Sequence, residues 1–159
     1  MRVGLPDLNV LIALAWPNHV HHQAALSWFE RNKGGEWATT PFTQTGFVRL
    51  SSNELLVGEA KSPGEAMILL GRIVALPGHV FWTDDISIVE TSFLQREKVH
   101  GYRQVTDAHL LALALRHGGR LITMDRGVRS LVPDGHEERE VVCVLQEAAS
   151  VVSPKSPGI

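Results

Sequence analysis

The stretch Arg2-Val3-Gly4-Leu5-Pro6-Asp7, followed by Leu8-Asn9-Val10-Leu11-Ile12-Ala13-Leu14-Ala15-Trp16, opens the chain and decides its fold. The short apolar run that ends at Pro6 predicts a strand over Arg2–Pro6. The nearly all-apolar segment behind it predicts a helix over Leu8–Trp16 that is buried on most sides. A strand followed at once by a buried helix is typical of an α/β layer fold.

The same alternation continues to the end of the chain. Further strands are expected near Glu36–Thr40, His79–Trp82, Arg120–Met124 and Glu140–Leu145. Helices are expected over His22–Asn32 and Phe42–Ser52, from Pro63 onward, over Asp84–Arg96 with Thr83 as its cap, and over Asp107–His117 with Thr106 as its cap. This pattern predicts about five short strands in a mostly parallel sheet with helices packed on it.

Composition places the chain among ordinary globular domains. It has 159 residues, of which 44% are hydrophobic and 20% are charged, a net charge of −2 and one cysteine, Cys143. These values exclude a disordered chain and a strongly basic one, although a local basic patch remains compatible with them. We expect one domain over residues 1–148 and a frayed tail over residues 149–159. No signal peptide or membrane span is expected, and the cytoplasm is the simplest location.

Three aspartates stand where an α/β fold places its functional groups. Asp7 follows the first strand, Asp125 follows the strand Arg120–Met124, and Asp107 lies in the first turn of a long apolar helix. Ligands of open α/β sheets bind beyond the carboxyl ends of the strands, so the three carboxylates are expected to converge there. Each alone is explained by a turn or by the helix dipole. Together they predict a site for a hard divalent cation such as Mg²⁺ or Mn²⁺.

Three motifs carry a family resemblance. The blocks Leu5-Pro6-Asp7-Leu8-Asn9-Val10-Leu11, Val105-Thr106-Asp107-Ala108-His109-Leu110-Leu111 and Leu121-Ile122-Thr123-Met124-Asp125-Arg126-Gly127 resemble the acidic motifs of PIN-domain proteins, specifically of VapC-type toxin ribonucleases. The resemblance implies a PIN-like three-layer sandwich. It also implies an endoribonuclease in which Asp7, Asp107 and Asp125 hold Mg²⁺ or Mn²⁺ for hydrolysis of RNA phosphodiesters.

The resemblance also assigns supporting roles and shows one departure. The family usually supplies a Glu where this chain has Gln44, which keeps a carbonyl oxygen but contributes no charge. Asn9, Thr106 and Thr123 are expected to support the carboxylates or to orient a water. Candidate phosphate contacts, chosen because they lie near the motifs, are Arg49, Arg126 and Arg129.

Two other functions stay open at this stage. Because Gln44 replaces an acid, the domain is alternatively a PIN module that binds RNA or a protein partner without cleaving. Asp7-Leu8-Asn9 also weakly resembles the opening of an aspartyl-nucleophile phosphohydrolase, although that pattern needs a second Asp where Asn9 stands. The VapC-type resemblance implies a small VapB-like antitoxin partner and a homodimer.

Overall fold

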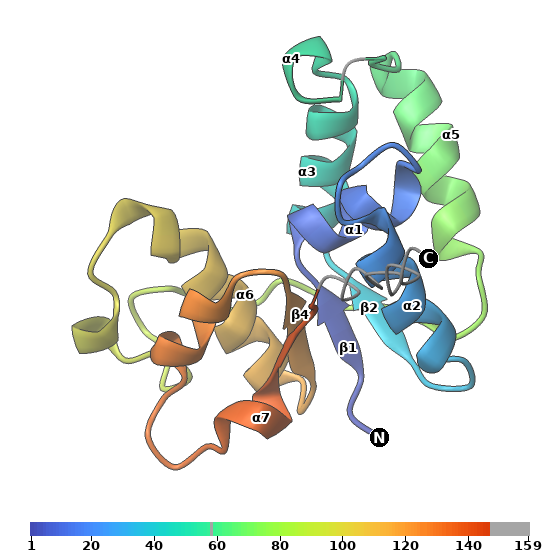
Figure 1. Ribbon diagram of the computed structural model, residues 1–159. Helices are drawn as coiled ribbons and strands as arrows, with labels where there is room; N and C mark the ends of the chain where they lie inside the picture. Colours follow the sequence, from blue (N-terminus) through green and yellow to red (C-terminus); the bar gives the residue numbers. More distant parts are fainter. Residues whose placement is uncertain (58, 147–159) are drawn as a thin grey trace, which may run out of the picture.

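The computed structural model describes residues 1–57 and 59–146, so the predicted tail over residues 149–159 lies outside the described residues. Its centre is a five-stranded sheet in the order β3-β2-β1-β4-β5, in which all neighbouring strands are parallel. The strands are β1 (Gly4–Pro6), β2 (Trp37–Thr39), β3 (His79–Phe81), β4 (Arg120–Thr123) and β5 (Val142–Val144). Each lies within its predicted range, and the α/β class is confirmed (Figure 1).

Helices cover both faces of the sheet and make three layers (Figure 1). One face carries α1 (Leu8–Ala15), α2 (His22–Arg31), α3 (Pro41–Ser51) and α5 (Pro63–Val74), and the short α4 (Glu54–Val57) follows α3. The other face carries α6 (Val105–Arg116), α7 (Glu138–Val141) and the 3₁₀ helix η3 (Arg126–Leu131). Two further 3₁₀ turns, η1 (Arg96–Lys98) and η2 (Tyr102–Gln104), precede α6.

The strand residues divide the core between these two layers because successive side chains point to opposite faces. Leu121 packs with Leu5 and the apolar side of α6, whereas its neighbour Ile122 packs with Trp37 and helices α1 and α2. All four of these side chains are buried. Strands buried on both faces read as continuous apolar runs, which is how β1 and β4 appear in the sequence.

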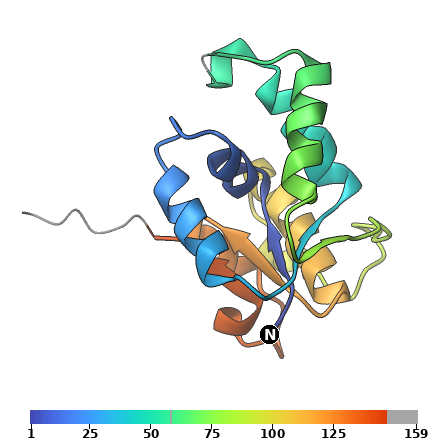
Figure 2. The same ribbon diagram turned by 90° about the vertical axis from the view of Figure 1, so that its right-hand side faces the viewer.

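Helices α3, α4 and α5 project beyond the edge of the sheet, and α3 and α5 lie side by side (Figures 1 and 2). Thr40 caps α3 by accepting the backbone N–H of Thr43, and Ser62 caps α5 by accepting that of Glu65. Pro41 and Pro63 occupy the first turns, where a missing N–H costs nothing. The two caps fix where this helical pair begins.

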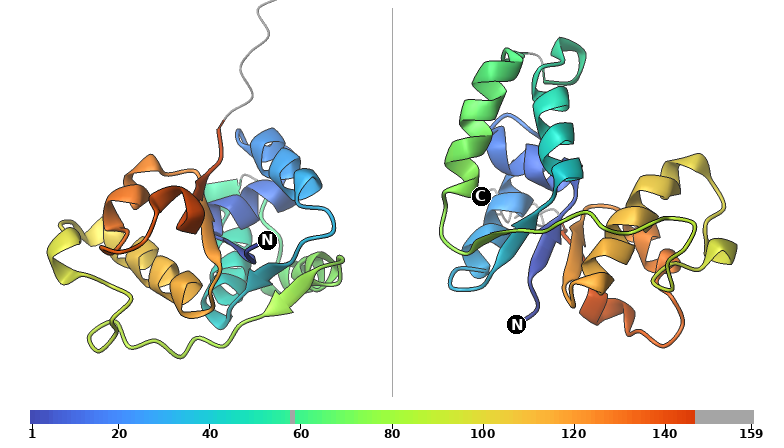
Figure 3. Two further views of the ribbon diagram at one scale, coloured as in Figure 1. Left: turned by 90° about the horizontal axis from the view of Figure 1, so that it is seen from below. Right: turned by 180° about the vertical axis from the view of Figure 1, so that it is seen from behind.

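The prediction of a helix over Asp84–Arg96 is wrong. Residues after β3 cross to the opposite layer as an irregular loop, ending in η1 (Figure 3). The carboxylates that would begin the helix are instead used by α6, since Asp84 bonds His109 and Asp85 bonds Arg116. Val89, expected on the apolar stripe, is 81% exposed.

The predicted cap of α6 is also wrong. The helix begins at Val105, its N-cap is Gln104 without a side-chain cap bond, and Thr106 is exposed in the first turn. The Gln104 side chain instead accepts the backbone N–H groups of His100 and Gly101. The start of α6 is therefore defined by the turn before it rather than by a hydroxyl.

None of the helices in the described part of the chain is long and apolar enough to span a bilayer.

Candidate active site

Asp7 links the central strand to the first helix. It follows β1 directly and caps α1, because its Oδ1 accepts the backbone N–H of Val10 at 2.8 Å. The residue is only 7% exposed. Burial raises the pKa of its carboxyl above the ordinary value, against the lowering effect of hydrogen bonds from Val10, Thr123 and Asn9 and with a small upward contribution from Asp125. A cap alone does not require so much burial, so this carboxylate is held where a positive charge would stabilise it.

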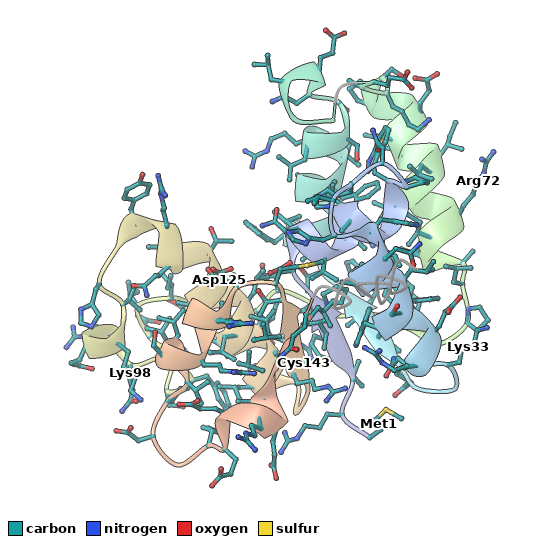
Figure 4. All side chains as sticks on the ribbon, viewed as in Figure 1. Met1, Lys33, Arg72, Lys98, Asp125 and Cys143 are labelled. Atoms are coloured by element: carbon teal, nitrogen blue, oxygen red, sulfur yellow. The ribbon has the colours of Figure 1, made fainter. Side chains whose placement is uncertain are left out.

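Asp125 lies beyond the carboxyl end of the neighbouring strand. β4 pairs with β1 in a register that aligns Pro6 with Ile122, so β4 ends one residue further along, at Thr123, and Asp125 is the second residue after it. The Oδ1 of Asp125 accepts the N–H of Gly127 at 2.7 Å and caps η3. Its own N–H donates to the hydroxyl of buried Thr123 at 3.0 Å. Figure 4 shows Asp125 at the edge of the sheet, between the two helical layers.

Asp107 completes the acidic set from the opposite helical layer. It lies in the first turn of α6 and is half-buried. Burial, followed by repulsion from the carboxylates of Asp7 and Asp125, raises the pKa of Asp107 to about 6. The charges of Asp7 and Asp125 therefore reach Asp107, so the three predicted acids lie near one another beyond the carboxyl ends of β1 and β4.

The acidic set consists of carboxylate oxygens, the donors that a hard divalent cation prefers. In residues 1–57 and 59–146, no group of three or more His, Cys, Asp or Glu side chains is arranged so that it could by itself hold a metal ion. Mg²⁺ keeps several waters and is bound through one or two carboxylates together with substrate phosphates. Carboxylate donors that repel one another fit an ion that is bound in this way.

The predicted supporting residues differ in whether they contact the acids. The Thr123 hydroxyl contacts both acids, since it interacts with the Asp7 carboxylate and accepts the N–H of Asp125. Asn9 contributes through its backbone N–H, which favours the charged form of Asp7 and lowers its pKa. Its side chain is exposed, as is that of Thr106.

Gln44 lies near the carboxyl end of the strand beside β1. Its amide Nε2 donates to the Thr39 hydroxyl at 2.9 Å, and that hydroxyl also contacts His79 Nε2 at 2.8 Å. Thr39 is the last residue of β2, the neighbour of β1 in the sheet. Gln44 also lines a groove between α3 and α5 with Val48 and Met67. That position 44 takes the place of the family's acid stays a prediction.

The three candidate arginines lie in distinct surroundings. Arg126 is exposed beside Asp125, whereas Arg129, one turn further, is half-buried with its Nε unbonded. Arg49 is exposed on α3. Within the described residues none of the three forms an ion pair, so each is available to an anion.

A second polar pair, absent from the sequence-based prediction, lies beside the crevice. His109 Nε2 is 3.0 and 3.1 Å from the two carboxylate oxygens of Asp84, and the Phe42 ring meets the His109 ring edge-on. The sequence offered one indication of this pair, namely that His109 follows Asp107 by two residues. It offered no indication for Asp84, because that residue was expected to begin a helix.

Comparison with known proteins identifies the class to which this fold belongs. The family model of the PIN domain matches residues 5–132, and the chain belongs to the PIN-domain family.

Similar proteins place the chain among the VapC-type members of the PIN-domain family. The chain is 50% identical over 122 residues to ribonuclease VapC39 of Mycobacterium tuberculosis (strain ATCC 25618 / H37Rv), covering 77% of this chain and 88% of the relative. It is 45% identical over 129 residues to ribonuclease VapC38 of the same strain, covering 81% and 89%. Ribonuclease VapC44 is 39% identical over 125 residues, covering 79% and 87%. These similarities confirm the VapC-type resemblance stated from the motifs.

Proposed function

We propose that this protein is an endoribonuclease toxin that hydrolyses RNA phosphodiesters with Mg²⁺ or Mn²⁺ held by Asp7, Asp107 and Asp125. The observation that carries the proposal is the electrostatic conflict among these acids, which raises the pKa of Asp107 to about 6 through burial and through Asp7 and Asp125. Folding that brings three carboxylates together is unfavourable unless a cation offsets their charge. The printed names of the relatives, all ribonucleases, support RNA as the substrate.

Different residues of the chain hold the carboxylates in place and bind the RNA. The Val10 N–H and the Thr123 hydroxyl hold the Asp7 carboxylate in place, and the N–H of Gly127 holds that of Asp125. When bound, a divalent ion lowers the pKa of a water and offsets charge on phosphoryl oxygens. Arg126, exposed next to Asp125, is placed to bind a backbone phosphate of RNA.

Partners follow from the same proposal. We assign a VapB-like antitoxin and a second copy of the chain as protein partners, and the cytoplasm as the place where RNA is met. The α3–α5 groove, about 520 Å³ in volume and lined by four apolar and four polar residues, supports a protein partner. Met67 and Ile68 on α5 are 59% and 60% exposed, which is unusual for large apolar residues on a helix that needs no partner.

The two alternatives differ in their support. The non-cleaving module still rests on Gln44, whose neutral amide bonds Thr39 at the carboxyl end of β2. The aspartyl-nucleophile phosphohydrolase needs an accessible Asp7, whereas Asp7 is 7% exposed and its Oδ1 caps a helix.

The proposal is tested with purified protein and a mixed RNA pool, incubated with Mg²⁺, with Mn²⁺ or with EDTA, followed by mapping of the cut ends. We expect cleavage only with the metals and its loss in Asp107→Asn. Asp134→Asn is the matched control, since Asp134 is a surface carboxylate bonded to Gln95 and Lys98. Metal-independent cleavage, or full activity in Asp107→Asn, would contradict the assigned site.

A further inference from the structure

A small pocket opens at the edge of the sheet opposite the acids. It lies between the turn that connects α2 to β2 and the turn that connects α5 to β3. Both turns are at the amino ends of these parallel strands, whereas the acids lie beyond the carboxyl ends of β1 and β4. The pocket has a volume of about 190 Å³, and its lining includes Phe29, Asn32, Lys33, Gly34, Gly35 and Trp37. Figure 4 shows Lys33 well apart from Asp125.

The aromatic walls of the pocket are fixed by their own contacts. Trp37 Nε1 donates to the carbonyl oxygen of Pro77 at 3.2 Å, which ties β2 to the turn before β3. The Phe29 ring meets the Trp37 ring edge-on, with 5.6 Å between the ring centroids. An apolar cavity of roughly 150 Å³ binds benzene. This pocket is therefore large enough for a single six-membered ring with a small substituent.

Asn32 supplies the pocket with a buried polar group, since the residue is only 8% exposed. Buried side-chain amides are nearly always hydrogen-bonded, yet in residues 1–57 and 59–146 no group bonds the Asn32 amide. The backbone does not require asparagine, because its φ is −86° and the positive φ of this turn belongs to Gly34. A Cβ on Gly35 would stand 3.1 Å from Asn32 Oδ1 and 3.3 Å from Nδ2. The amide thus lies against Gly35 with its donor and its acceptor unused.

The chemistry of the lining determines which ligand fits. A side-chain amide presents a C=O acceptor beside an NH₂ donor, so its partner must carry a donor beside an acceptor. Lys33 brings a positive charge to the lining and takes part in none of the ion pairs found in the described ranges. Apolar walls with a few convergent polar groups are typical of small-molecule sites.

We propose that this pocket binds a one-ring aromatic molecule that carries an adjacent hydrogen-bond donor and acceptor, which pair with the side-chain amide of Asn32. The ring packs against Phe29 and Trp37. A primary carboxamide on an aromatic ring has this donor–acceptor pair, and so has the edge of a pyrimidine base. Because the pocket stands apart from the acids, the inference does not depend on the proposed ribonuclease function.

Benzamide and acetophenone test the proposal, because acetophenone keeps the ring and the carbonyl but has a methyl group in place of the NH₂ donor. Each is titrated into the ¹⁵N-labelled full chain, and binding is followed by NMR in the backbone amide signals of Gly34 and Gly35. We expect benzamide to shift both signals and to bind about tenfold more tightly, since acetophenone leaves the Asn32 oxygen unpaired. No shift with either compound, or equal affinities, would overturn the proposal.

A variant connects that ratio to Asn32. Asn32→Leu keeps the size of the side chain and removes both polar groups, so the two compounds should bind equally. Asn18→Leu is the matched control, since Asn18 is exposed between α1 and α2 and does not line the pocket, and it should keep the tenfold preference. A preference that survives Asn32→Leu contradicts the proposal. Thermal melts establish that both variants are folded, and the comparison in the unmodified protein decides the question if one is not.

Cytidine 5′-monophosphate and a five-nucleotide RNA of cytidine distinguish the sources of such a ring, with EDTA present so that the RNA stays intact. Shifts with the monophosphate that weaken in Lys33→Gln identify a free nucleotide. Shifts with the RNA and not with the monophosphate identify a base of a single strand. Shifts with benzamide alone identify an aromatic carboxamide. Each of these three results upholds the pocket and names its ligand.

Discussion

Gly46 on α3 lies directly against the side chain of Leu8 on α1. A Cβ at residue 46 would stand 2.5 Å from Leu8 Cδ2 and 2.7 Å from Leu8 Cδ1. Glycine is therefore required here by the close approach of two helices and not by its backbone freedom. Because Leu8 follows Asp7, this contact also determines how far α3 stands from the acidic crevice.

Gly46→Ala should lower the free energy of unfolding by about 1–3 kcal/mol, because an extra methyl must displace Leu8 in a packed core. Gly71→Ala on α5 is the matched control. A Cβ there meets nothing within 4 Å, so the same substitution should stabilise by about 0.5–1 kcal/mol. Urea unfolding of both variants measures the difference. Equal effects would mean that α3 and α1 are not in close contact.

Asp107→Asn should stabilise the metal-free protein above about pH 6. Burial and the charges of Asp7 and Asp125 raise the folded pKa of Asp107 from 3.8 to about 6. The folded state therefore holds the proton more tightly than the unfolded state, and stability falls as pH rises from about 4 to 6. The amide removes that loss, so its gain in Tm should be absent at pH 3.5 and complete at pH 8.

Asp85→Asn is the control, because the pKa of Asp85 is shifted in the opposite direction to that of Asp107. The hydrogen bond and charge of Arg116 lower the pKa of Asp85, so its contribution is present above the unfolded pKa and lost as pH falls. Its amide variant should be no more stable than the parent protein at pH 8. If both variants were more stable than the parent protein at pH 8, the cause would be the general surface charge and not the repulsion among the three acids.

Gln44→Glu should strengthen metal binding. Gln44 bonds Thr39 at the carboxyl end of β2, next to β1, so a carboxylate there adds negative charge on the side of the sheet where the acids lie. Thermal melts with and without Mn²⁺ should show a larger metal-linked rise in Tm for the variant than for the parent, since that rise follows affinity. An equal rise in the two proteins would remove position 44 from the site.

Arg126→Ala should weaken RNA binding and reduce its dependence on salt. Loss of one phosphate contact lowers the slope of log K against log salt by about 1 for any sequence. Arg72→Ala on α5 is the control, because Arg72 projects from the far side of the molecule from Asp125 (Figure 4). An unchanged slope in Arg126→Ala would remove this residue from the RNA contact.

Local sequence predicts most of this fold. β1 and β4 are apolar runs that end in aspartate, and their parallel pairing places Asp7 and Asp125 at one edge. Asp107 lies in the first turn of α6, as its position before a long apolar run predicts. In these three cases the neighbours along the chain determine the residue's place in the fold, whereas its role in binding a metal stays a prediction.

The failures come from contacts between distant segments. The loop containing Asp84 and Asp85 has apolar residues at helical spacing, but its carboxylates are held by His109 and Arg116 on α6. Local sequence does not contain these contacts between distant segments.

The order of strands also governs when the acidic residues can come together during synthesis. β1 leaves the ribosome well before its partner β4, which begins at Arg120, paired with Gly4. Until that later strand emerges, one edge of β1 has no neighbour, and Asp125 is not yet available to join Asp7. Under the proposed function, a nascent chain cannot cut RNA while most of it is still being translated, and an antitoxin that binds the finished fold has time to be made beside it.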